Sequence, residues 1–419
     1  MNKKLIVIAA VLLLIGGVAA IGLYLYPYLP SQPPRADDAG STPQGVQDVV
    51  NANNKFAFEL YSELNKVGDG NIFFSPFSVS SALAMTYEGA KGQTGDEMKK
   101  VFHFPENSIL RPNFAAVYNE INKGDKAYKL STGNALWVQK DYQLLGDYTL
   151  AVEKYYGGKA ANLDFVGDTE NSRQTINSFI EEQTNNKIKD LIPAGVLDAN
   201  TRLVLTNAVY FKGTWTWEFD KSDTRDEDFK IIPTNFVKTP MMFMEPDKAR
   251  FNYAETEELQ IIELPYKGDK ISMLILLPSD NLDSLEPSLT VEKLSEFKAQ
   301  MKETKLEAIF LPKFEFDSKY FMKDKLIALG LNTAFTDSAD FSGMTGDKDL
   351  KIGSIIHQAF VKVDEEGTEA AAATAVIMQP TSINPNRKIF RADHPFIFII
   401  QQKATGNILF MGKVSDPTK

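Results

Sequence analysis

The sequence predicts an α+β fold, because segments with helical periodicity gather in the first half of the chain and strand-like runs in the second. Apolar residues recur at helical spacing in three early segments, 49–64, 78–87 and 171–182. Runs of β-branched or aromatic residues bounded by Gly, Pro or Asp follow mainly later, at 203–211, 260–264, 271–277, 308–316, 360–363, 397–401 and 408–413. The length of the body favours two domains, although no linker divides the chain after residue 50.

The composition is that of a folded domain and excludes several classes of function. The 419 residues include 43 % hydrophobic and 24 % charged residues, with 28 Phe, 15 Tyr and 3 Trp available for a core. A net charge of −10 argues against a nucleic-acid partner, since phosphate binding needs a basic face. The absence of cysteine excludes disulfides, thiol nucleophiles and zinc fingers. With three histidines far apart in the sequence, we expect neither a metal site nor a cofactor.

The N-terminal segment 1–26 predicts a membrane anchor or a signal segment. Lys3 and Lys4 precede 22 uncharged residues, Leu5 to Tyr26, which as a helix would span about 33 Å and cross a bilayer core of about 30 Å. The positive-inside tendency then places the N-terminus in the cytoplasm. A cleaved signal peptide with Ala19-Ala20 as its cut site is the alternative. Both interpretations place the body outside the cytoplasm, on the cell membrane through a single span or secreted.

The next segment predicts a flexible tether. Residues 27–47 are rich in Pro, Ser, Gly, Asp and Gln, a composition typical of linkers. The folded body would therefore begin at residue 48 and run to residue 419.

Motifs of common enzyme classes are absent from the sequence. It contains no Gly-x-Ser-x-Gly elbow, no His-Glu-x-x-His, no P-loop and no Gly-x-Gly-x-x-Gly. Usual bases and nucleophiles are scarce. We therefore expect a protein that is not an enzyme.

One segment, 365–387, fits no single secondary structure. Propensity alone favours a surface helix at its alanine run, 370–375, but Gly367 interrupts one side, and two prolines follow it in a stretch typical of an exposed loop. With a period of two, one face of the segment is uncharged and begins with small residues, which suits a strand inside a sheet. A segment compatible with both an exposed loop and a buried central strand is a candidate bistable element.

Several motifs in a common order resemble the serpin family of protease inhibitors over essentially all of residues 48–419. They are EEGTEAAAAT (365–374), FRADHPFIFII (390–400), FMGKV (410–414), NIFFSPFS (71–78), LTNAVYFKGTW (205–215) and LPKF (311–314). The resemblance implies one large domain of three β-sheets and about nine helices, with an exposed reactive-centre loop at about 365–388. It overrules the two-domain expectation from length.

The resemblance also implies suicide inhibition of a serine protease. The protease attacks the loop and forms an acyl-enzyme; the freed hinge then inserts into the main sheet as a new central strand, and deacylation stalls. The partner implied is the target protease, held covalently by a monomeric inhibitor. A non-inhibitory serpin that acts as a chaperone or binding module is the alternative; its hinge would carry charged or bulky inward residues, whereas the hinge here is small.

Three groups of residues take roles by this resemblance. The hinge is formed by Glu365, Glu366, Gly367, Thr368, Glu369, Ala370, Ala371, Ala372, Ala373 and Thr374. The breach cluster, where the sheet would open, is Lys313, Trp215 and Glu365. The shutter cluster, under the central strands, is Ser75, Ser78, Asn207 and His357. Taken singly, Trp215 would be a packed core aromatic in any fold, and His357 would be a buried structural histidine.

Spacing within the family places the cleaved bond between Thr381 and Ser382, seventeen residues into the stretch that begins at Glu365. The neighbouring bonds, Pro380-Thr381 and Ser382-Ile383, stay open as alternatives. Thr381 is small, uncharged and β-branched, which suits the shallow apolar pocket of elastase-like or some subtilisin-like proteases.

Overall fold

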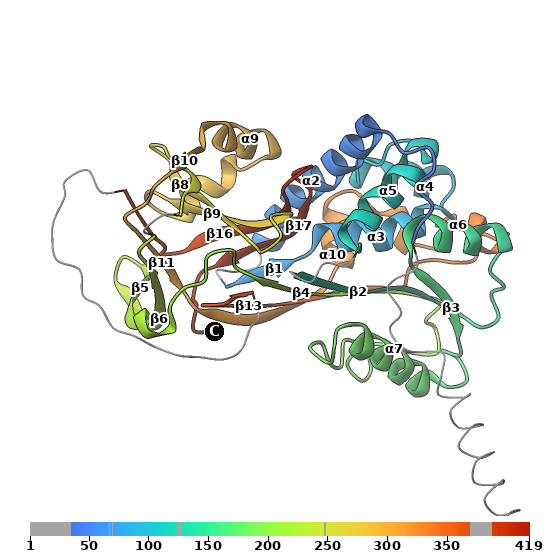
Figure 1. The fold of residues 1–419 in the computed structure, drawn as a ribbon. Coiled ribbons are helices and arrows are strands. Elements are labelled where there is room, and N and C mark those ends of the chain that lie inside the picture. Colours follow the sequence, from blue (N-terminus) through green and yellow to red (C-terminus); the bar gives the residue numbers. More distant parts are fainter. Residues whose placement is uncertain (1–34, 67, 69, 124–127, 247–248, 369–387) are drawn as a thin grey trace, which may run out of the picture. The chain divides into compact units, whose positions relative to one another are not determined.

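The computed structural model describes residues 35–419 apart from 67, 69, 124–127, 247–248 and 369–387. These described residues form ten α-helices and three β-sheets (Figure 1), close to the three sheets and about nine helices implied by the resemblance. The helices are α2 (Pro43–Asn65), α3 (Pro76–Tyr87), α4 (Gly92–Val101), α5 (Asn107–Ile121), α6 (Gly146–Tyr156), α7 (Thr169–Gln183), α8 (Leu282–Leu285), α9 (Val291–Gln300), α10 (Lys323–Ala328) and α11 (Ser342–Thr345).

A six-stranded sheet carries the region of interest. Its order is β12 (Phe314–Phe321), β13 (Ser354–Asp364), β14 (Gly367–Thr368), β4 (Leu203–Thr214), β2 (Tyr128–Gln139) and β3 (Lys159–Leu163). Helix α7 covers one face of this sheet, and α3 packs against the other (Figure 1). Gly133 of β2 permits the close approach of α7, because a Cβ there would lie 2.9 Å from Cδ1 of Ile180.

The two other sheets complete the domain. The seven-stranded sheet has the order β1 (Ile72–Phe74), β17 (Ile408–Val414), β16 (Phe396–Gln402), β9 (Ile271–Pro278), β8 (Leu259–Pro265), β7 (Phe251–Glu255) and β10 (Lys302–Thr304). The four-stranded sheet has the order β15 (Ile389–Arg391), β11 (Ala308–Pro312), β6 (Asn235–Met244) and β5 (Arg225–Ile232).

The larger of two apolar cores joins the three sheets and most of the helices, and the smaller one lies between the six-stranded sheet and α7. The ring of Phe73 stacks on those of Phe398 and Phe410, with centroids 5.6 and 5.2 Å away. Every residue of β9, β16 and β17 is buried, and so are the eleven residues from Pro76 to Thr86 of α3. Elements that are buried on all sides have continuous apolar or small-residue runs in the sequence, and they show no amphipathic pattern.

Several boundaries differ from those predicted. Helix α2 begins at Pro43, capped by the Thr42 side chain, and Ala36 is already buried, with its amide donating to Oδ1 of Asn119. The folded body therefore starts before residue 48, inside the segment interpreted as a tether. The predicted strand 308–316 is two strands, β11 and β12, which separate at Lys313 because they belong to different sheets.

Candidate functional site

The central strands of the six-stranded sheet are paired over part of their length and separated over the rest. Strands β13 and β4 run parallel and pair directly from Ser354↔Val204 to Phe360↔Tyr210. Beyond that point the two residues of β14 lie between them. Thr368 pairs with Val363 on β13 and with Gly213 on β4. Gly367, one register step away, pairs with Asp364 on β13 and with Thr214 on β4. We call this divergence the seam; the first residues of the predicted hinge occupy its open end.

Gly367 is required at its position by close backbone contact. Its φ is +154°, and a Cβ built there would lie 2.0 Å from the carbonyl oxygen of Gly213 and 2.8 Å from Cα of Thr214. Both neighbours are main-chain atoms of β4, which cannot rotate away as a side chain could. A larger residue would therefore have to move the hinge or the strand.

Thr368 is buried at the open end of the seam and has a polar partner. Its hydroxyl lies 2.7 Å from that of Tyr266, whose ring stacks on Trp215 with centroids 4.5 Å apart. Burial raises the pKa of Tyr266, so its phenol stays protonated at neutral pH. The hydroxyl pair satisfies two groups that would otherwise be buried without partners.

Trp215 holds the turn between β13 and β14. Its indole Nε1 donates to the carbonyl oxygen of Asp364 at 3.1 Å, and its backbone amide donates to the carbonyl of Glu366 at 2.9 Å. The turn that leads into the hinge is thus fixed by the residue that follows directly after β4.

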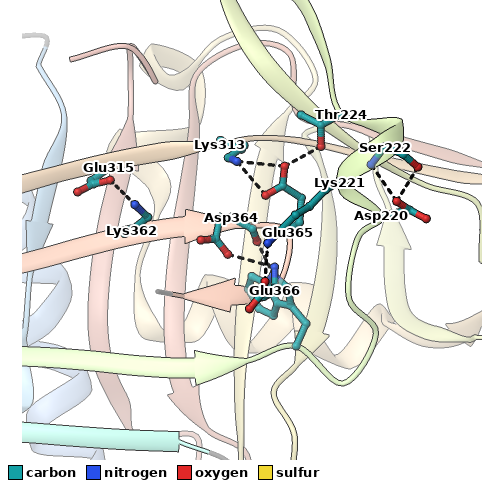
Figure 2. A network of polar contacts seen from close by, with 11 residues as sticks. Asp220, Lys221, Ser222, Thr224, Lys313, Glu315, Lys362, Asp364, Glu365 and Glu366 are labelled. Carbon is teal, nitrogen blue, oxygen red and sulfur yellow. Dashed lines mark hydrogen bonds and ion pairs between the residues drawn. The ribbon is translucent and has the colours of Figure 1, made fainter. Parts of the chain in front are cut away.

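The buried carboxylate of Glu365 forms an ion pair with the partly exposed Lys313 at the same end of the sheet (Figure 2). Lys313 Nζ lies 2.8 and 3.1 Å from the two carboxylate oxygens, and the hydroxyl of Thr224 donates to one of them at 2.8 Å. Burial alone would raise the pKa of Glu365, but the hydrogen bonds from Lys313 and Thr224 outweigh it and leave the pKa below its ordinary value. The carboxylate is therefore charged at neutral pH.

A second ion pair holds the next hinge residue. Lys221, in the short helix that precedes β5, hydrogen-bonds to the carboxylate of Glu366 (Figure 2). This hydrogen bond raises the pKa of Lys221 against the opposing effect of burial. Both glutamates at the start of the hinge are thus tied to cations from other segments.

The shutter cluster lies where β13 and β4 are still paired. His357 and Asn207 are register partners, and His357 Nδ1 hydrogen-bonds to Oδ1 of Asn207. The Asn207 amide in turn donates to Oγ of Ser78 at 2.7 Å and to Oδ1 of Asn134 on β2 at 2.6 Å. Ser75 adds its backbone amide, which donates to His357 Nε2 at 3.1 Å.

These bonds define the protonation state of His357. Because Nε2 accepts from the Ser75 amide, the proton of the neutral ring lies on Nδ1, where it is donated to Asn207. A second proton, on Nε2, would point at the backbone amide of Ser75, which is itself a donor. Complete burial lowers the pKa of His357 to about 3, although the hydrogen bond with Asn207 acts in the opposite direction.

The structure brings the members of each predicted cluster together, within the part of the chain that it describes. Lys313, Trp215 and Glu365 surround the turn before β14, and the four shutter residues share one hydrogen-bond network. Lys221, Thr224, Tyr266 and Asn134 also take part, and the motif analysis missed them because they belong to other segments and form no motif. The rest of the hinge, Glu369 to Thr374, and the bond between Thr381 and Ser382 lie outside the described residues.

Replacing Gly367 with alanine is expected to displace β14 from the seam, because the new Cβ would overlap main-chain atoms of β4. Such overpacking typically costs about 1–3 kcal/mol. Hydrogen–deuterium exchange of a peptide covering Phe211 to Trp215 measures the effect, and we expect faster exchange there. The matched control is Gly346→Ala, where φ is also positive (+97°) but nothing lies within 4 Å of the added carbon. Equal exchange in the two variants would contradict the close contact.

Lowering the pH is expected to destabilise the protein through His357. An unfolded imidazole has a pKa of about 6.5, so below that pH the unfolded chain binds a proton that the folded chain, with its pKa of about 3, does not. Stability is then fully present above pH 6.5 and falls by about 1.4 kcal/mol per pH unit below it. Urea unfolding at pH 7 and pH 5 should show that the wild type loses about 2 kcal/mol more than His357→Gln. Identical losses would refute the assignment.

Comparisons with known proteins agree with this architecture. Residues 51–417 match the family described as Serpin (serine protease inhibitor). An uncharacterized serpin-like protein of Methanosarcina mazei is 43% identical over 378 residues, which is 88% of each chain. Leukocyte elastase inhibitor A of Rattus norvegicus is 40% identical over 89% of this chain and 100% of its own. The crystal structure of uncleaved ovalbumin superposes with a TM-score of 0.79 at 30% identity, over 88% of this chain and 100% of its own. The chain therefore belongs to the serpin family, which is described as one of serine protease inhibitors and is not a family of enzymes.

Proposed function

We propose that this chain is an inhibitory serpin that traps a serine protease by inserting its cleaved reactive loop into the six-stranded sheet. The observation that carries the proposal is the seam, in which Gly367 and Thr368 already pair with both β13 and β4. Further insertion extends this pairing and separates the strands at the positions where they now pair with each other.

The register of the seam gives the length of the inserted strand. Each residue beyond Thr368 would lie one step further along β13 and β4, towards Ser354 and Leu203. Ser354 is nine residues before Val363, so Ile377 would lie beside it; Leu203 is ten before Gly213, so Met378 would end the strand. Two residues later comes Pro380, which cannot donate to a ladder. The register therefore leaves the proposed bond, Thr381-Ser382, just beyond the end of the inserted strand.

The side chains of the hinge suit the sites that this register assigns to them. Thr368 faces the core, and every second residue after it would face the same way. Ala370 would lie between Val361 and Phe211, and Ala372 between Ala359 and Val209, which are all buried in the core. Such sites accept small side chains and exclude large ones.

Two polar hinge residues also have suitable partners in the inserted state. Thr374 would lie between His357 and Asn207, where its hydroxyl can take over both ends of the hydrogen bond that insertion breaks. Glu369, on the opposite face, would lie between Lys362 and Lys212. The pattern of small, polar and acidic residues thus favours insertion over the alternative, a non-inhibitory binding module.

The target we propose is an elastase-like or subtilisin-like serine protease, since Thr381 offers a small uncharged side chain. The name of the rat relative, leukocyte elastase inhibitor A, supports this class. We further propose that the domain acts outside the cytoplasm, anchored or secreted through residues 1–26. That segment lies outside the described residues, and among those described no helix has the length and apolarity to cross a membrane.

Replacing Thr368 with arginine is expected to convert the inhibitor into a substrate. An arginine cannot occupy the buried site of Thr368 beside Tyr266 without leaving its charge unpaired, so it should hold the hinge out of the seam and slow insertion until deacylation wins. Incubation with an elastase-like protease measures this as a complex that survives boiling in detergent. We expect the wild type to form it and the variant to yield at least about tenfold less, with cleaved protein instead.

Thr368→Ser is the matched control, because it keeps the hydroxyl that meets Tyr266. It should form the complex as the wild type does. Cleavage of the wild type in the loop without any complex would reject inhibition and favour the binding-module alternative. Unchanged inhibition by Thr368→Arg would reject insertion at this seam.

A further inference from the structure

Charged side chains form a row across the outer face of the six-stranded sheet, at the open end of the seam. One register step from the level of Thr368, Glu315 of β12 pairs with Lys362 of β13 on one side of the seam. On the other side, at the same level, Lys212 of β4 pairs with Lys129 of β2. Because Thr368 faces the core, side chains one step away face outward. We call Glu315, Lys362, Lys212 and Lys129 the charge row.

The two halves of the charge row differ in their balance of charge. On one side, Nζ of Lys362 lies 2.7 Å from Oε2 of Glu315 (Figure 2). On the other side, Lys212 and Lys129 are both exposed cations, and they are direct cross-strand partners. The ammonium group of Lys129 donates to Oδ1 of Asn185 at 2.9 Å, which is a neutral acceptor. Like charges directly opposite each other on neighbouring strands are destabilising, so the β4 side of the seam has an excess of positive charge.

A further cation lies close to the charge row, in a chain whose net charge is −10. Phe360 is the next outward-facing residue of β13 after Lys362, and Nζ of Lys187 lies 5.8 Å from the centroid of its ring. An acidic side chain at that level, Asp317, lies on β12, on the side of β13 away from the seam. A local excess of one charge attracts groups of the opposite charge. The outer face of the seam is therefore suited to an acidic residue.

The chain itself supplies this acidic residue. Because Thr368 pairs with both β13 and β4, the next residue, Glu369, would lie between Lys362 and Lys212 in an inserted strand. Glu369 lies outside the described residues, and its place here follows from the register of Thr368 alone. The row would then alternate in charge from Glu315 to Lys212, with the new carboxylate beside a lysine on each side. Opposite charges on neighbouring strands stabilise a sheet.

We propose that Lys212 is a positioning residue for trapping, because it attracts Glu369 into the seam and speeds the first step of insertion. This inference rests on the proposed function. After cleavage, the acyl-enzyme is either released by deacylation or trapped by insertion, so the faster of the two steps decides the outcome. Glu369 is the first residue to be inserted after Thr368, and each later residue can pair with both strands only after it.

The test is the ratio of cleaved to trapped inhibitor after reaction with pancreatic elastase, read from a denaturing gel. This ratio equals the deacylation rate divided by the insertion rate. We expect a ratio about two- to fivefold higher for Lys212→Gln than for the wild type, the range typical of an exposed ion pair. Glu369→Gln should raise the ratio similarly. The double variant should raise it no further, since both changes remove the same contact.

Salt gives a readout that a merely structural role of Lys212 would not move. At about 1 M NaCl the Debye length falls to about 3 Å, so the ratio should rise in the wild type and stay constant in Lys212→Gln. The matched control is Lys129→Gln, which removes an exposed lysine of the same row that lies one strand further from the seam. It should give the wild-type ratio. Thermal unfolding of each uncut variant verifies that it is folded.

Three outcomes would overturn the role of Lys212. They are a wild-type ratio for Lys212→Gln, an equal rise for Lys129→Gln, and single effects of Lys212→Gln and Glu369→Gln that multiply in the double variant. In each of these cases the trapped complex still forms, so the proposed function stands. If the wild type is cleaved without any trapped complex, the proposed function is wrong, and the role of Lys212 with it.

Discussion

The two central strands of the six-stranded sheet cannot be bonded to each other and to an inserted strand at the same positions. In this chain the competition is already visible: β13 and β4 pair directly over seven positions and are separated by the hinge over two. Each further inserted residue would break one direct pair between β13 and β4. It would instead pair with both strands, and the inner face of the hinge would be buried. With net hydrogen-bond contributions of about 0.5–1.5 kcal/mol each, ten further residues supply about 5–15 kcal/mol. That is comparable to the whole stability of an ordinary domain, so the uncut form would be held by a kinetic barrier.

The proposed barrier would have parts at both ends of the seam. At the open end, Lys313 and Lys221 hold the two glutamates that begin the hinge, and Trp215 and Tyr266 hold its backbone and first hydroxyl. At the paired end, the His357–Asn207 bond spans β13 and β4, and the amide of Asn207 continues the network to β2 and α3. A buried polar network that is fully satisfied favours one arrangement strongly. Here the network bonds β13 to β4, and in the proposed insertion Thr374 would take over its bonds.

The sequence could predict the membership of the site better than its geometry. The motifs contain the breach residues and three of the shutter residues, whereas His357 lies outside them and was assigned by the family resemblance alone. A period of two over 368–378 predicts which hinge side chains would face inward. Partners outside motifs were missed: Lys221, Thr224 and Asn134 meet the site through folding of distant segments. The run 308–316 has the pattern of one strand, since nothing local marks Lys313 as the point where the chain passes from one sheet to another. Similarly, the start of α2 was obscured by the linker-like composition before it.

The proposed trapping mechanism depends most directly on energy stored in the uncut loop. The measurement is calorimetric unfolding of the intact protein and of protein cut once between Gln379 and Pro385 by a non-target protease. If cutting releases the hinge into the seam, the unfolding temperature should rise by at least about 10 °C, given the free energy of the added ladders. An unfolding temperature that stays the same or falls after cutting would contradict the account.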